Sequence, residues 1–143
     1  MAKVLSINIS ENKGTIKKPI EQGEFVIRHG LKDDAHAGDW HRQVSLLGIE
    51  SFRKMEVDGL NLPVGSFAEN LTTEGIELFT LPIGTMLKIG ETIHEVTQIG
   101  KKCHTGCEIS QLVGKCVMPK EGIFTKVIIG GVIKKDDEII IQK

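Results

Sequence analysis

The sequence predicts a mainly β fold: a single-domain β-barrel with a few short helices. Most apolar segments are short, rich in β-branched residues and bounded by Gly, Pro, Asn or Asp, which is the pattern of strands. Glycine accounts for 16 of the 143 residues, which suits many tight turns. A chain of this length forms one domain, expected over 1–143, and no repeat or linker divides it. Many strands and few helices in one domain favour a closed or partly closed barrel.

The expected elements follow one another along the chain. Apolar, β-rich runs predict strands over 4–9, 24–28 and 43–47. Ile49, Phe52 and Met55 stand at helical spacing, so a helix is expected over 49–55, and 107–112 could form one or two further helical turns. Later apolar runs predict strands over 75–78, 86–89, 92–97, 124–129 and 138–142, the last two as a pair. Gly90 and Glu91 suit the two-residue loop of a hairpin between 86–89 and 92–97.

The composition excludes several classes of function. The 18 basic and 19 acidic residues give a net charge of -1, and only 4% of the residues are aromatic, which argues against nucleic-acid binding. No apolar run approaches the roughly 18 residues of a membrane span, and the N-terminus carries no signal-peptide pattern. We therefore expect a cytoplasmic protein with reduced thiols and no membrane or nucleic-acid partner.

All three cysteines lie between positions 103 and 116. Cys107 would stand near the start of the possible helix, and nearby Lys101 and His104 would favour its thiolate. Such a thiolate could attack, carry sulfur or ligate a soft metal. Two alternatives stay open: Cys103, His104, Cys107 and Cys116 could form a structural zinc site, or the cysteines could simply fill a loop.

Two further polar segments could bind a ligand. In 33–43, His36 and His41 could ligate a metal or move protons, and Arg42 could hold a phosphate or carboxylate. In 65–75, a polar cluster interrupts an apolar stretch and could bond a polar ligand. The alternatives are a solvated loop for the first segment and a turn with local side-chain bonds for the second.

The motifs of the chain, taken in order, resemble those of the MOSC domain family, named for the C-terminal domain of molybdenum cofactor sulfurase. The similarity covers about residues 3–142. The matching pieces are GL at 30–31, DAHAG at 34–38, WHRQVSLL at 40–47, FAENLTTEGI at 67–76, LPIGT at 81–85, IGKKCH at 99–104 with Cys107, MP at 118–119, EGIF at 121–124 and GG at 130–131.

The resemblance implies a mostly β-barrel fold and an association with the molybdenum cofactor, through sulfur transfer or binding of molybdenum. The reactive cysteine of the family falls on Cys107, which is then either a sulfur carrier or the metal ligand, and Cys103 matches a second cysteine of the subset that this chain resembles. The residues expected to hold molybdopterin, the organic part of the cofactor, are His36, His41, Arg42, Glu69, Asn70, Thr72, Lys101 and His104.

The resemblance also bears on partners. Pyridoxal phosphate is not expected within this chain, so a separate cysteine desulfurase would supply sulfur and a molybdoenzyme client would receive it. A molybdenum-dependent reductase of N-hydroxylated compounds is one alternative function, and a non-enzymatic module that delivers the cofactor is another.

The chain departs from its relatives at two turns, where Asp33 and Asp136 stand in place of the usual Gly. If φ is positive there, each Asp costs a few tenths to about 1 kcal/mol.

Overall fold

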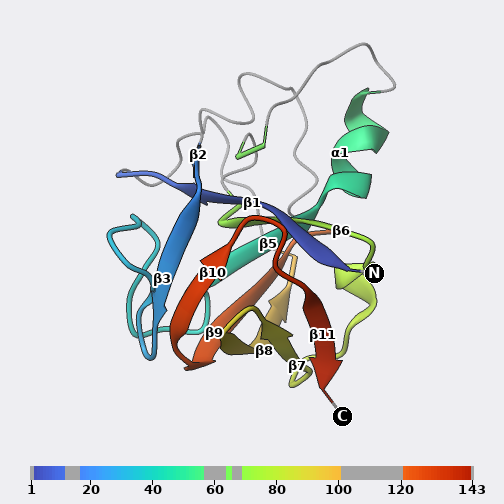
Figure 1. The fold of residues 1–143 in the computed structure, drawn as a ribbon. Helices are drawn as coiled ribbons and strands as arrows, with labels where there is room; N and C mark the ends of the chain where they lie inside the picture. Colours follow the sequence, from blue (N-terminus) through green and yellow to red (C-terminus); the bar gives the residue numbers. More distant parts are fainter. Residues whose placement is uncertain (1, 12–16, 57–63, 66–68, 101–120, 143) are drawn as a thin grey trace.

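The computed structural model describes residues 2–11, 17–56, 64–65, 69–100 and 121–142. Within these residues the fold is mainly β, with one α-helix and one short 3-10 helix (Figure 1). In chain order the elements are β1 (Lys3–Ile9), β2 (Lys18–Ile20), β3 (Gln22–Val26), β4 (Gly30–Leu31), β5 (Val44–Gly48), α1 (Ile49–Glu56), β6 (Leu71–Glu74), η1 (Leu78–Thr80), β7 (Met86–Ile89), β8 (Thr92–Ile99), β9 (Ile123–Ile129), β10 (Gly131–Lys134) and β11 (Ile139–Gln142).

The strands form two sheets. The larger has eight strands in the order β11-β7-β8-β9-β5-β6-β1-β2, and the smaller has three in the order β10-β3-β4. Neighbouring strands are antiparallel except β5 and β6, which run parallel. Two parallel neighbours need a crossover connection, and α1 lies in the segment that joins them.

The core lies between these sheets. β8 and β3 alternate buried and more exposed residues, as expected of strands with one face on the core. β5 is buried along its whole length because it stands between β9 and β6. Phe52 on α1 is also fully buried. β5 is therefore a rigid element, and the polar residues next to it are held firmly.

The first strand also approaches the last. Lys3 forms an antiparallel bridge with Glu138, and the Val4 amide donates to the Asp137 carbonyl at 2.8 Å. The mainly β prediction is confirmed. A closed barrel is not found among the described residues, so the barrel part of the prediction stays a prediction.

Several local predictions are confirmed. The helix over 49–55 is α1, and β7 and β8 form the expected hairpin, with Ile89 opposite Thr92. Asp33 and Asp136 both have positive φ, 70° and 75°. At these turns the chain adopts the left-handed conformation that glycine would take without strain.

Other predictions are wrong. No strand covers 75–78: the strand is β6, four residues earlier, because Leu71–Glu74 can pair with both β5 and β1. The two C-terminal strands do not pair with each other, since β9 pairs with β5 and β8 while β11 pairs with β7. The strand expected to end at 28 ends at Val26, and Arg28 lies in a turn with φ 63°. The short strands β2, β4 and β10 were not expected at all. The possible turns at 107–112 lie outside the described residues.

Candidate functional site

The second polar segment docks against the central strand β5. The Asn70 backbone amide donates to the Ser45 carbonyl at 2.9 Å and to Ser45 Oγ at 3.0 Å. In return, Asn70 Oδ1 accepts a bond from the Ser45 amide at 3.0 Å. Asn70 is fully buried, so these bonds fix it against the sheet.

Glu69 and Thr72 belong to the same buried network. Glu69 Oε2 accepts bonds from Thr72 Oγ1 at 2.5 Å and from the Gly65 amide at 3.0 Å. Asn8 Nδ2 donates to the Glu69 carbonyl at 3.1 Å and to Thr72 Oγ1 at 3.0 Å. The tertiary structure thus brings together three predicted ligand-binding residues, Glu69, Asn70 and Thr72, and all three are fully buried. Their contact with a pterin stays a prediction.

The first polar segment contributes a buried ion pair. Lys17 Nζ lies 2.8 Å from Asp34 Oδ1, and neither side chain is exposed to solvent. Asp34 also accepts bonds from the Ser10 and His36 amides, each at 3.1 Å. Burial by itself raises the pKa of Asp34, but Lys17 and hydrogen bonds from Asn70 and Ser10 outweigh it, so its pKa lies below the ordinary value. Asp34 therefore stays ionised and holds Lys17 as an ammonium.

Lys17 determines how His36 is protonated. Lys17 Nζ lies 3.0 Å from His36 Nδ1. An ammonium can only donate, so Nδ1 must accept and the ring proton resides on Nε2. His36 keeps 24% of its side chain exposed. The Nε2 side of the ring can therefore act only as a hydrogen-bond donor.

Arg42 lies between two aromatic rings. Its guanidinium carbon lies 4.7 Å from the Trp40 ring centroid and 5.5 Å from that of Phe124. Stacking of this kind holds the planar guanidinium in one orientation. Arg42 Nε is buried and has no hydrogen-bond partner among the described residues. A buried cationic donor without an acceptor is costly, and an anionic ligand would satisfy it.

His41, in the loop before β5, contacts the end of β8. Its Nε2 is 2.9 Å from Gln98 Oε1, and its carbonyl accepts a bond from Thr97 Oγ1. Gln98 Nε2 in turn donates to the Gly100 carbonyl at 2.7 Å, and the Gly100 amide donates to the Gly122 carbonyl at 2.7 Å. Gly100, which follows β8, and Gly122, which precedes β9, therefore lie next to each other, close to His41.

The remaining predicted site residues lie between Gly100 and Gly122 in the sequence. Lys101, Cys103, His104 and Cys107 lie outside the described residues, as does Cys116 of the zinc alternative. In the part of the chain that is described, no group of three or more His, Cys, Asp or Glu could hold a metal ion. No helix there is long and apolar enough to cross a membrane.

Lys17 is a residue of this site that the sequence did not predict. Lysine is almost never fully buried unless it is paired, so its burial marks a special site. Nothing in the local sequence distinguishes Lys17 from the exposed Lys18 beside it. The carboxylate that pairs with it belongs to Asp34, 17 positions further along the chain.

A comparison with protein families identifies this chain. A model of the MOSC domain matches residues 33–140, well over half of the sequence. The chain belongs to the MOSC domain family. This family is associated with the molybdenum cofactor, which makes molybdopterin the first ligand to consider for this MOSC domain.

Solved structures share the fold of this MOSC domain. The YUAD protein from Bacillus subtilis has a TM-score of 0.80 at 18% identity, over 96% of this chain and 93% of that one. YiiM from Geobacillus stearothermophilus has a TM-score of 0.77 at 19% identity, over 100% and 76%. YiiM from Escherichia coli has a TM-score of 0.71 at 19% identity, over 100% of this chain and 70% of that one. At these identities the similarity establishes the fold alone. No curated protein matches the chain.

Proposed function

We propose that this MOSC domain binds molybdopterin beside Arg42, where β8 ends and β9 begins, and carries sulfur for the molybdenum cofactor on Cys107. Membership of the MOSC family supports the link to the cofactor. The unsatisfied Arg42 Nε, on a guanidinium held between Trp40 and Phe124, is the observation that carries the proposed position.

The residues present fit a phosphate-bearing pterin. Molybdopterin has a phosphate, and a guanidinium fork matches phosphate geometry with two parallel bonds. We assign the phosphate to Arg42 and Lys101, with His104 and His41 as further cofactor-binding residues.

The polar edges of the pterin need hydrogen-bond partners. We assign them to His36 and to the Glu69, Asn70 and Thr72 cluster. When bound, the molybdenum centre supplies the redox and sulfur-exchange chemistry. The chain's own residues hold the anion, orient the pterin and move protons at His36 and His41.

Loading of sulfur requires only the chain and a donor. The Cys107 thiolate attacks the outer sulfur of a persulfide on a separate cysteine desulfurase. A new S–S bond forms on Cys107, the S–S bond of the donor breaks, and the donor cysteine leaves as a thiolate. We assign Cys103 the role of an auxiliary or resolving thiol. The recipient is a molybdoenzyme client, and we place the exchange in the cytoplasm.

The test separates pterin binding from sulfur loading. The chain is produced in a host that makes the cofactor, and bound pterin and molybdenum are measured per chain. Arg42→Met should lose most of the pterin, and Arg42→Lys should retain part of it because one charge without the fork remains. After incubation with a cysteine desulfurase and cysteine, mass spectrometry should show one added sulfur on the wild type and none on Cys107→Ser. Cys116→Ser is the matched control and should behave as wild type.

Several results would overturn the proposal. A chain that neither binds pterin nor gains sulfur on Cys107 contradicts both parts. If Cys107→Ser loses molybdenum but the wild type never gains sulfur, Cys107 is a metal ligand and the reductase alternative takes over. Pterin binding that does not depend on Cys107, with no added sulfur, indicates a delivery module. One zinc per chain, with unfolding on chelation, indicates the structural zinc alternative.

A further inference from the structure

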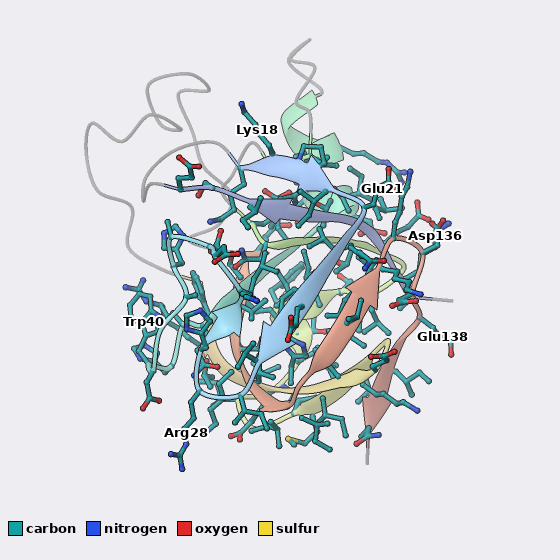
Figure 2. All side chains as sticks on the ribbon, turned by 60° about the vertical axis from the view of Figure 1, so that its left-hand side comes forward. Lys18, Glu21, Arg28, Trp40, Asp136 and Glu138 are labelled. Carbon is teal, nitrogen blue, oxygen red and sulfur yellow. The ribbon has the colours of Figure 1, made fainter. Side chains whose placement is uncertain are left out.

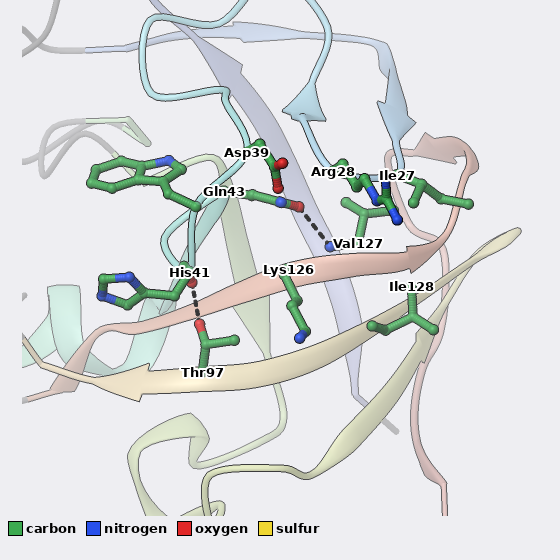
Figure 3. Close-up of a pocket in the computed structure, with 10 residues that line it drawn as sticks. Ile27, Arg28, Asp39, His41, Gln43, Thr97, Lys126, Val127 and Ile128 are labelled. Carbon is green, nitrogen blue, oxygen red and sulfur yellow. Dashed lines mark hydrogen bonds between the residues drawn. The ribbon is translucent and has the colours of Figure 1, made fainter.

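A cavity lies beside the turn that joins β3 to β4 (Figure 3). Its volume is about 410 Å³, enough for a small organic molecule. Four segments of the chain line it: the β3–β4 turn, the loop before β5, strand β8 and strand β9. Its polar lining consists of Arg28, Asp39, His41, Gln43, Thr97 and Lys126.

Gln43 turns a hydrogen-bond donor toward this cavity. Gln43 is only 3% exposed, and its Oε1 accepts a bond from the Val127 amide at 2.9 Å. A backbone amide can only donate, so this bond decides which end of the side-chain amide is oxygen. The NH₂ end is left for the cavity, and no hydrogen bond of Nε2 is found among the described residues. At the cavity wall this NH₂ group can donate to an oxygen of a ligand.

Arg28 brings a cation to the cavity from a strained turn. Its φ is 63°, a conformation in which a bulky residue other than Gly is uncommon. Backbone strain of this kind persists where the surrounding structure holds it, and such sites are often functional. None of the ion pairs within the described residues involves Arg28. In Figure 2, Arg28 lies on the same flank of the molecule as Trp40, away from Asp136 and Glu138.

Lys126 supplies a second cation. Its Nζ lies 3.7 Å from Glu95 Oε1, and both side chains are partly exposed, so the pair is weak and an anion can compete for the ammonium. Asp39 is the one acidic residue among those that line the cavity. The cavity therefore offers two cations and a buried amide donor against one carboxylate.

The rest of the lining is apolar. Ile27, Val127 and Ile128 form this part, and Ile27 is 52% exposed, which is high for a side chain of its type. The indole of Trp40 also lines the cavity. An aliphatic group would cover these surfaces and gain from leaving water.

We propose that this cavity is a binding site for a small organic anion, in which a carboxylate or phosphate group is attached to a short aliphatic chain. The anionic oxygens bind Gln43, Arg28 and Lys126, and the aliphatic part covers Ile27 and Ile128. Arg42, which carries the proposed position of the pterin, does not line this cavity, whereas His41 lines it.

Trp40 makes the test direct. It is the only tryptophan in a chain without tyrosine, so intrinsic tryptophan fluorescence reports on this cavity. The full chain is titrated with isovalerate, with isobutyl phosphate and with isovaleramide, which is uncharged and has nearly the shape of isovalerate. The acid, the phosphate ester or both should change the emission at concentrations where the amide does not. The relative affinities of the two anions show which group the site prefers.

Variants assign the binding to the cavity. Arg28→Asn removes the charge and tolerates positive φ, so the fold is kept. Arg28→Asn and Lys126→Met should each weaken anion binding about tenfold, the usual effect of losing one charged hydrogen bond. Asp39→Asn should strengthen binding, because it removes the one negative charge of the lining. Lys88→Met, at an exposed position on β7, is the matched control and should leave binding unchanged.

Other results contradict the proposal. Equal binding of the acid and the amide shows that no anion site exists, and no binding of either anion removes the site altogether. Arg42 also contacts the Trp40 ring, so an anion at Arg42 could change the same signal. If Arg42→Met abolishes the response while Arg28→Asn and Lys126→Met do not, the anion occupies the proposed pterin site and this inference is wrong. Retention of the response in Arg42→Met supports it, whether or not molybdopterin binds.

Discussion

Replacing Asp34 by Asn tests the buried ion pair that orients His36. The substitution removes the negative charge but nearly preserves the shape of the side chain. The Lys17 ammonium, 2.8 Å away and fully buried, would then lose its counter-charge. Breaking a buried pair by neutralising one partner typically costs about 3–5 kcal/mol. That is a large part of the roughly 5–15 kcal/mol by which a domain is stable.

Denaturant unfolding followed by circular dichroism measures this loss. The wild type is compared near neutral pH with Asp34→Asn, with Lys17→Met and with the double variant. The double variant leaves no buried charge at this position, so it should be less destabilised than the sum of the two single variants. A coupling energy of at least about 1 kcal/mol is expected for two groups in direct contact.

The same pair predicts a pH dependence. The pKa of Asp34 in the folded protein lies below its ordinary value of 3.8. The pair therefore contributes its full stability above the ordinary pKa, and this contribution is lost as the pH falls through the folded pKa. Asp34→Asn should lack this acid-dependent contribution. A loss of less than about 1 kcal/mol in Asp34→Asn at neutral pH, the size found for exposed pairs, would refute the reasoning.

Two further predictions concern the sheet and its turns. Asp33→Gly should stabilise the protein by about 0.5 kcal/mol, because φ is 70° and Gly adopts that conformation without strain, while Asp33→Ala should destabilise it. Equal thermal midpoints for the Gly and Ala variants would contradict this. Burial lowers the pKa of His94 to about 3, well below the 6.5 of a free histidine. This group should therefore lower the free energy of unfolding by about 1.4 kcal/mol per pH unit as the pH falls from 6.5 to 3. His94→Gln should flatten that slope when unfolding is measured across the same pH range. An unchanged slope in His94→Gln would argue against this prediction.

Several local features of this protein could be predicted from the sequence because the geometry of neighbouring residues decides them. The helix α1 shows the spacing of Ile49 and Phe52 along one face, and the β7–β8 hairpin shows a two-residue turn between two β-rich runs. The left-handed turns at Asp33 and Asp136 were predictable because the resemblance to the MOSC family implies glycine at both positions. The family itself was identified from motifs that stand in a fixed order along the chain.

Strand partners were not readable in the same way. Alternation indicates which face of a strand is buried but not which strand lies beside it. For this reason the sequence predicts that β9 pairs with β11, whereas β9 pairs with β5 and β8 in the structure. The strand β6 was placed too late, because its position depends on pairing with two distant strands.

The sequence alone therefore identified a mainly β chain of the MOSC family and the residue types of its polar segments. Only the tertiary structure decided that Lys17 is buried against Asp34, that His36 consequently carries its proton on Nε2, and that Arg42 is held between two rings. It also brought Arg28, Gln43 and Lys126 to one cavity. Charge, burial and protonation depend on atoms that are close in space but distant along the chain, so the printed order of residues does not contain them.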